Sequence, residues 1–196
     1  MNRLKGVITS SMAVLLAAGM TLNYSACSKE SPLQSAPLQL NSTKAHKRTT
    51  DELTFLKSQN PFLGKVFKVS QLITAANGGS IEVGNEKTGY SRITFKPGDL
   101  SANLNVGFWW NSNCFEVEFS PHGSNFNNPV LIRLSYKDAN LTGIDEDSLK
   151  LWYYHEEEGI WEQAGHEINK QLKYVEGTIT HFSRYAVAWA HKRKRN

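Results

Sequence analysis

The sequence predicts an all-β protein, an antiparallel β-sandwich over residues 65–190, and three observations support this fold class. Apolar side chains alternate with polar ones in short runs, as at Ile81 and Val83. Turn-forming residues separate these runs, as at Lys96–Asp99. The 196-residue chain is 40% apolar and 11% aromatic, which supplies large side chains for the two inner faces of a sandwich.

Residues 1–26 have the parts of a secretory signal peptide. Arg3 and Lys5 give a basic start, and the apolar stretch that follows is too short for a typical membrane-spanning helix. It ends at Ser25-Ala26-Cys27, which resembles the end of a bacterial lipobox, whose cysteine is lipidated and becomes the mature N-terminus. We therefore expect palmitate on Cys27 and an exported lipoprotein anchored to the outer membrane or cell surface of a bacterial envelope. The alternative is a plain signal peptide with an incidental cysteine.

Residues 27–49 are rich in Ser, Thr, Pro, Gln and Lys without an apolar period, and this composition predicts a flexible tether. The formal net charge of +4 belongs to the two ends of the chain. Residues 1–26 carry two positive charges and the basic tail 191–196 carries four, which leaves −2 for the part between them. We therefore expect no nucleic-acid partner, since the domain itself has no basic excess and an exported protein rarely meets nucleic acid. The tail is interpreted as a solvated end or as a contact to anionic lipid.

A short helix and a lead-in are predicted over residues 50–64. Thr49-x-x-Glu52 is a capping-box pattern ahead of the apolar Leu53 and Leu56, which favours a helix over about 50–58. Pro61 then ends it.

From Lys65 onward the apolar period is two, and each run predicts a strand with one buried face. In chain order, the inward residues of these strands are Ile81 and Val83; Phe115, Val117 and Phe119; Ile132, Leu134 and Tyr136; Leu149, Leu151 and Tyr153; and Tyr185, Val187 and Trp189.

Five segments follow one another in an order that is typical of a known domain. They are Gly78–Ile81, Ile93–Leu100, Phe119–Val130, Leu151–Trp161 and His181–Val187. Together they resemble the ZU-five domain, the β-sandwich of ankyrins, zonula occludens proteins and Unc-five netrin receptors, and most of all its secreted bacterial relatives. The resemblance implies a sandwich that binds other proteins. We expect neither a death domain nor a second sandwich in this chain, so the partners of the animal proteins are not carried over.

The most specific part of the resemblance also has a physical interpretation. Pro121 and Pro129 each remove a backbone donor, and Gly123 permits a positive φ. Phe126 is placed to plug one end of the sandwich. His122 is interpreted as a residue that hydrogen-bonds loop backbone, with ligand binding as the alternative.

The tripeptide His181-Phe182-Ser183 is the candidate with covalent chemistry. The resemblance implies that some ZU-five-containing proteins cleave themselves between the Phe and the Ser. The hydroxyl of Ser183 would attack the carbonyl carbon of Phe182 while His181 acts as general base. The alternative is an ordinary strand start, in which Phe182 packs and the other two residues satisfy local backbone groups.

Phe108-Trp109-Trp110 places at least one indole on the outer face of a strand, and an exposed Trp109 or Trp110 is a possible sugar or peptide contact. Packing under a loop is the alternative. No histidine pair has metal-ligand spacing, and the sequence has neither a nucleophile elbow nor a phosphate loop, so we expect no metal, no cofactor and no conventional enzyme.

These observations predict a lipid-anchored envelope protein whose sandwich is a non-catalytic protein-interaction or structural module. Its partners would be the membrane, through Cys27, and an envelope protein or glycan. The two alternative functions are self-cleavage at Phe182-Ser183 and carbohydrate binding.

Overall fold

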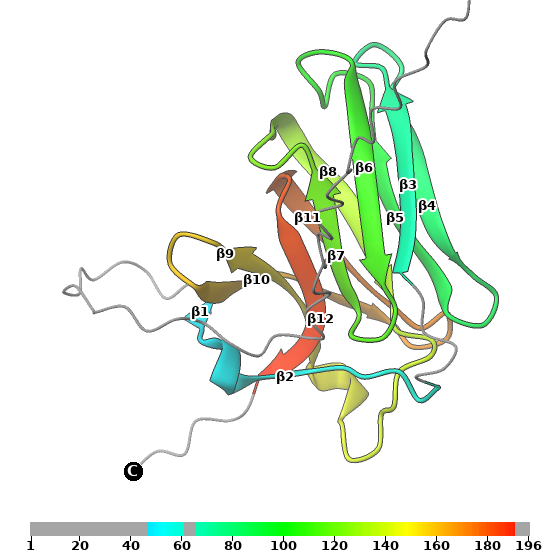
Figure 1. Cartoon of the computed structure of the whole chain (residues 1–196), viewed down its shortest axis with the longest axis vertical. Coiled ribbons are helices and arrows are strands. Elements are labelled where there is room, and N and C mark those ends of the chain that lie inside the picture. The colour runs from blue at the N-terminus through cyan, green and yellow to red at the C-terminus, as the bar shows by residue number, and fades with distance from the viewer. Residues whose placement is uncertain (1–46, 61–65, 191–196) are drawn as a thin grey trace, which may run out of the picture.

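The computed structural model describes residues 47–60 and 66–190, which form an all-β protein (Figure 1). The predicted fold class is therefore confirmed. The signal peptide, Cys27, the tether up to residue 46, the lead-in residues 61–65 and the tail 191–196 lie outside the described residues. Within the described ranges, no helix has the length and apolar character needed to cross a membrane.

Every pair of strands is antiparallel. Their bounds are β1 (Lys47–Arg48), β2 (Leu53–Phe55), β3 (Val66–Ile73), β4 (Gly79–Asn85), β5 (Gly89–Phe95), β6 (Leu104–Asn111), β7 (Glu116–Ser120), β8 (Asn125–Ser135), β9 (Leu149–His155), β10 (Ile160–Asn169), β11 (Tyr174–His181) and β12 (Arg184–Ala190), with single 3₁₀ turns at Thr50–Glu52 and Glu146–Ser148.

The strands belong to one continuous sheet that folds back on itself. Its order is β3-β6-β7-β12-β9-β10-β11-β8-β5-β4, and the two end strands are joined by a hairpin with a bridge between Thr74 and Gly78. The sandwich is thus a nearly closed sheet rather than two separate ones, because β12 pairs with strands from both sides, β7 and β9 (Figure 1).

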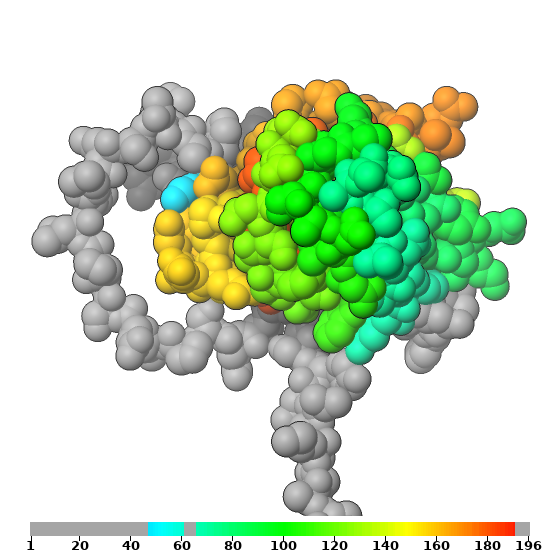
Figure 2. Space-filling model, turned by 90° about the horizontal axis from the view of Figure 1, so that it is seen from above, coloured from blue at the N-terminus to red at the C-terminus, as the bar shows by residue number. Residues whose placement is uncertain are grey.

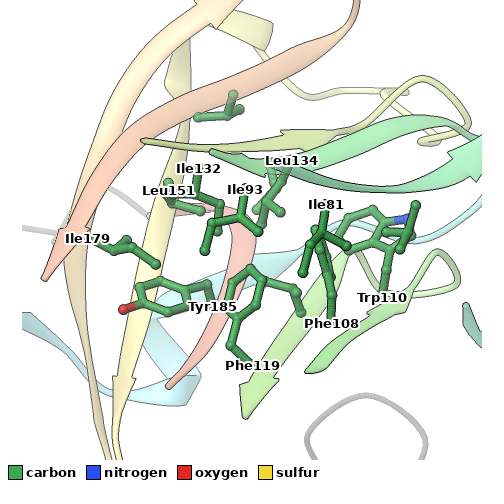
Figure 3. Close-up of a cluster of buried hydrophobic side chains, with 14 of the residues drawn as sticks. Ile81, Ile93, Phe108, Trp110, Phe119, Ile132, Leu134, Leu151, Ile179 and Tyr185 are labelled. Carbon is green, nitrogen blue, oxygen red and sulfur yellow. The ribbon is translucent and has the colours of Figure 1, made fainter. Parts of the chain in front are cut away.

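The main core fills the space inside this sheet, as the period-two pattern predicts. Ile93 and Ile132 point toward Phe108 and Phe119 from the opposite side (Figure 3). All four are fully buried. At about 25 cal/mol for each Å² of apolar surface, this burial is the largest favourable contribution to folding.

A second, smaller cluster lies on the outer face of β9, β10 and β12, where a strap formed by residues 47–56 covers it. Its buried members are Leu53, Trp152, Trp161, Ala186 and Ala188. The strap is in register with the sheet, because β1 pairs with β10 and β2 pairs with the end of β12. Both faces of β12 are therefore buried, which a strict alternation of apolar and polar residues would not show.

The strap corrects two predictions. The helix predicted over 50–58 is wrong, since one 3₁₀ turn is followed directly by β2. The predicted capping box does form, and in it the carboxylate of Glu52 accepts a hydrogen bond from the backbone N–H of Thr49 at 3.0 Å. Leu53 then adopts an extended conformation, because the free edge of β12 offers ladder hydrogen bonds to its backbone and a buried site to its side chain. The predicted tether also ends sooner, since Lys47–Arg48 already belong to the sheet.

Candidate binding groove

A groove of about 440 Å³ opens at one end of the sheet, where the β9–β10 hairpin, the β7–β8 connection and the β11–β12 crossover meet. We call it the histidine groove. It is lined by His122, Gly123, Tyr153, Tyr154, His155, Glu156, Glu157, Glu158, His181, Phe182 and Ser183. It thus brings together the two segments that the sequence singled out, around residue 122 and around residue 182.

The backbone of the crossover is fastened to the β7–β8 connection. Phe182 and Ser183 link β11 to β12, two strands that are not neighbours in the sheet. The Phe182 N–H donates to the Ser124 carbonyl at 2.9 Å, and the Phe182 carbonyl accepts from the Gly123 N–H at 3.2 Å. The Ser183 carbonyl accepts from the Phe119 N–H at 3.2 Å. Gly123 adopts the predicted positive φ, +73°, which a glycine reaches without strain.

The ring of Phe182 anchors the crossover in the core. It is 1% exposed and stacks on Phe119 at 5.7 Å between ring centroids. Its edge contacts are with Phe126 at 4.9 Å and with Phe95 at 6.2 Å. Phe126, which was expected to plug this end of the sandwich, is partly buried there and packs against the rings of Phe95 and Phe182.

Ser183 and His181 hold their side chains in different hydrogen bonds. The hydroxyl of Ser183, in a residue 7% exposed, donates to the Tyr154 carbonyl at 3.0 Å. The Nδ1 atom of His181 lies 3.3 Å from the Thr180 hydroxyl, and its ring packs edge-on against Tyr153. Burial lowers the pKa of His181, and the neighbouring His155 lowers it further. At neutral pH His181 is therefore a neutral imidazole, which is the form a general base needs.

His122 contacts two carboxylates, so the prediction that it hydrogen-bonds loop backbone is wrong. Its Nε2 atom lies 2.9 Å from Glu118 and its Nδ1 atom lies 3.6 Å from Glu156. The antiparallel ladders that bring β9 beside β12, and β12 beside β7, set these acidic residues around the ring. His122 therefore links the β7–β8 connection to the β9–β10 hairpin.

The inner wall of the groove is held by a short chain of side-chain hydrogen bonds that runs from Tyr153 through His155 to Glu162. The Tyr153 hydroxyl contacts Nδ1 of His155, whose Nε2 lies 2.8 Å from Glu162. Burial and the carboxylates of the hairpin raise the pKa of Tyr153 to about 12. The Tyr185 hydroxyl donates to the His181 carbonyl at 2.7 Å, and burial raises the pKa of Tyr185 as well. Both phenols therefore keep their protons and hold the wall in place.

The rim of the groove is acidic. Glu156, Glu157 and Glu158 follow one another at the exposed tip of the β9–β10 hairpin. One rim contact comes from the strap, where Lys47 Nζ lies 3.0 Å from Glu158. Figure 2 shows β1 (cyan) beside this hairpin (yellow). The hairpin tip was expected from the sequence, but its position beside residues 122 and 181 was not.

The other predicted site residues lie away from the groove. Trp110 of β6 is fully buried in the main core, so its prediction as a surface contact is wrong. Trp109 is 45% exposed, and the Lys68 ammonium lies 4.2 Å from its ring centroid, over one face. Pro129 lies in β8 at the point where the register with β11 is interrupted, which suits a residue that cannot donate to the ladder.

Two residues that line the groove, Tyr153 and His155, were not predicted as site residues, and neither was Glu162, whose carboxylate contacts His155. They come from the strand pair β9–β10, and the only sequence signal was that the three histidines of the groove and several carboxylates lie between residues 118 and 181. Among the residues that the structure describes, no group of three or more His, Cys, Asp or Glu side chains is arranged to hold a metal ion.

No protein-family model matches the chain. A comparison with curated proteins gives no match either. The resemblance to the ZU-five domain is therefore carried by the quoted motifs alone, and the function is argued from the groove.

Proposed function

We propose that the protein is a lipid-anchored protein of the bacterial envelope whose β-domain is a non-catalytic interaction module, and that its histidine groove receives a basic side chain of a partner protein. The observation that carries this proposal is the acidic rim, Glu156–Glu158, at the mouth of a groove of about 440 Å³. That volume lies near the lower end of the range for ligand pockets, about 300–1,000 Å³, and suits one or two side chains of a peptide.

The chemistry of the groove favours a lysine or arginine over an acid. Carboxylates attract the cation over a distance set by screening, about 8 Å at physiological salt. Tyrosine and histidine rings in the wall offer apolar faces for the aliphatic stem and a cation–π contact for the charged head. An anionic partner would meet the same rim with like charges.

A titration with a short oligolysine peptide tests this proposal. The parent chain, purified in a mild detergent, should bind the peptide with an affinity that falls as salt is added, and should not bind an oligoglutamate peptide of equal length. Glu156→Gln combined with Glu157→Gln should weaken binding about tenfold, since two charge-assisted contacts are lost.

Glu86→Gln is the matched control, because Glu86 is also an exposed glutamate of a hairpin turn, between β4 and β5. It should leave the affinity unchanged. Equal affinity of the parent chain for both peptides, or an equal loss in the control, would contradict the assignment of the groove.

The membrane anchor is tested separately at Cys27. Cys27→Ser should release the protein from the membrane fraction into the soluble fraction and abolish incorporation of labelled palmitate. Cys114→Ser is the control, since Cys114 is buried in the β6–β7 turn. Labelled palmitate that persists on the Cys27→Ser chain would contradict the anchor.

Self-cleavage between Phe182 and Ser183 is the second candidate, favoured by one further observation. The Gly123 N–H already donates to the Phe182 carbonyl at 3.2 Å, where it would stabilise the oxyanion of a tetrahedral intermediate. In this reaction Ser183 Oγ bonds to the Phe182 carbonyl carbon and the peptide C–N bond breaks. The Ser183 hydroxyl must first leave the Tyr154 carbonyl; neutral His181 then takes the hydroxyl proton and returns it to the departing nitrogen. Water then hydrolyses the ester to a carboxylate at Phe182 and a free amine and hydroxyl on Ser183.

Intact mass spectrometry of the denatured protein decides this candidate. Cleavage predicts loss of the fragment 183–196 under denaturing conditions only, because β12 is paired with β2, β7 and β9 in the native sheet. Ser183→Ala should keep the chain whole. An uncleaved parent chain after prolonged incubation would eliminate the candidate and leave the interaction module unaffected.

A further inference from the structure

One edge of β3 is open. β3 pairs with β6 in an unbroken register over eight residues, from Val66 opposite Asn111 to Ile73 opposite Leu104. Within the described ranges, no strand pairs with its other edge apart from the hairpin bridge at Thr74. β3, drawn in turquoise, lies beside β6 and at the molecular surface (Figures 1 and 2).

This edge lacks the usual devices that prevent strand pairing. β3 contains no proline and no bulge, and its single charged residue is Lys68. The Lys68 ammonium lies over the Trp109 ring on the face of the sheet, so the edge itself is not guarded by it. Three apolar side chains of β3 are exposed, Val66 at 46%, Val69 at 38% and Leu72 at 60%.

We propose that a second copy of this chain pairs with β3 in an antiparallel two-fold dimer, with Val69 opposite its own symmetry mate. A two-fold axis between antiparallel strands is perpendicular to the sheet and keeps each face on its own side, so the centre of pairing falls on a residue. With the centre at Val69, Val66 lies opposite Leu72 and Lys68 lies opposite Ser70. Every exposed apolar residue of β3 then has an apolar partner.

The neighbouring registers are worse. A centre at Lys68 puts two ammonium groups directly opposite each other, which is destabilising in a sheet. A centre at Ser70 puts Lys68 opposite Leu72 and leaves Val66 without a partner in the pair. The sequence of β3 is therefore self-complementary in one register, and this selects a second copy over an unrelated strand as the occupant.

Cysteine cross-linking tests the register. In the full chain purified in a mild detergent at high micromolar concentration, Val69→Cys should form a disulfide-linked dimer under mild oxidation, because opposite Cα atoms are about 4.5–5.5 Å apart. Gln71→Cys is the matched control on the same strand and face. Its two copies would be offset by four residues, about 13 Å, and should not cross-link above the parent chain, whose own cysteines set the background.

A charge exchange at the same position tests the dimer without a covalent bond. Val69→Lys and Val69→Glu should each sediment as monomers, and an equimolar mixture should sediment as a dimer. Both substitutions are at an exposed side chain, so circular dichroism should match that of the parent chain. Equal cross-linking at 69 and 71, no cross-linking at either, or a mixture that stays monomeric would overturn the proposal. None of these readouts depends on the histidine groove.

Discussion

Phe182→Ala should be the most damaging single truncation at the groove. Phe182 is 1% exposed and contacts the rings of Phe95, Phe119 and Phe126. Two of these neighbours have ladder partners, Phe95 of β5 opposite Gly79 and Phe119 of β7 opposite Phe108, and Phe126 lies between the paired residues Asn125 and Val130 of β8. They cannot close in on the cavity, so the loss belongs in the upper half of the range for Phe→Ala, about 4–5 kcal/mol.

Urea unfolding followed by tryptophan fluorescence measures this loss. The midpoint should fall while the slope m stays that of the parent chain, since the area exposed on unfolding hardly changes. Leu172→Ala, at a side chain 62% exposed, is the control and should change the free energy of unfolding by less than about 0.5 kcal/mol. A loss below about 1 kcal/mol for Phe182→Ala would refute the argument, because it would mean that the crossover is not anchored by this ring.

Three further substitutions test other parts of the structure. Burial lowers the pKa of His181 in the folded protein, so as the pH falls the imidazole is protonated in the unfolded chain before it is protonated in the folded one. The free energy of unfolding should therefore fall as the pH drops below 6.5, and it should fall less in His181→Gln. Equal pH profiles of the two proteins in urea titrations would contradict this. Leu53→Ala should cost about 2 kcal/mol in thermal unfolding and speed proteolysis near residue 46, because Leu53 holds the strap on the second cluster. Glu176→Gln should cost about 1 kcal/mol, since the carboxylate of Glu176 accepts hydrogen bonds from Nε and Nη2 of Arg133, which lies opposite Arg92. An unchanged unfolding midpoint would show that water replaces the pair.

Much of the fold could be predicted because the alternation of apolar and polar residues within a strand indicates which of its faces is buried. Leu149 and Leu151 alternate with polar or outward residues, and both are fully buried. The prediction of a helix over 50–58 failed because helix propensity and capping stabilise the segment less than pairing with β12, more than 130 residues away in the sequence. The edge of β12 gives Leu53 hydrogen bonds that an isolated helix of two turns could not match.

The groove was predictable only in its parts. The motifs around His122 and His181 could be seen separately, but nothing in their spacing says that Gly123 donates to the carbonyl of Phe182. That contact depends on where the chain crosses from β11 to β12, which is set by the whole order of strands. The partners of His122 depend on it too, since Glu118 is four residues away and Glu156 is on another hairpin.

The strap connects the groove to the part of the chain that leads toward Cys27. Lys47 is the residue of β1 that contacts the rim, at 3.0 Å from Glu158, and both side chains are about half exposed, 42% and 52%. An exposed pair of this kind is worth less than about 1 kcal/mol, so a basic side chain entering the groove competes with it at little cost. Lys47→Met should therefore raise the affinity for the oligolysine peptide by up to about fivefold while leaving β1 paired with β10. If Lys47→Met instead weakens binding, Lys47 organises the rim rather than competing for it, and the peptide must bind without displacing the contact to Glu158.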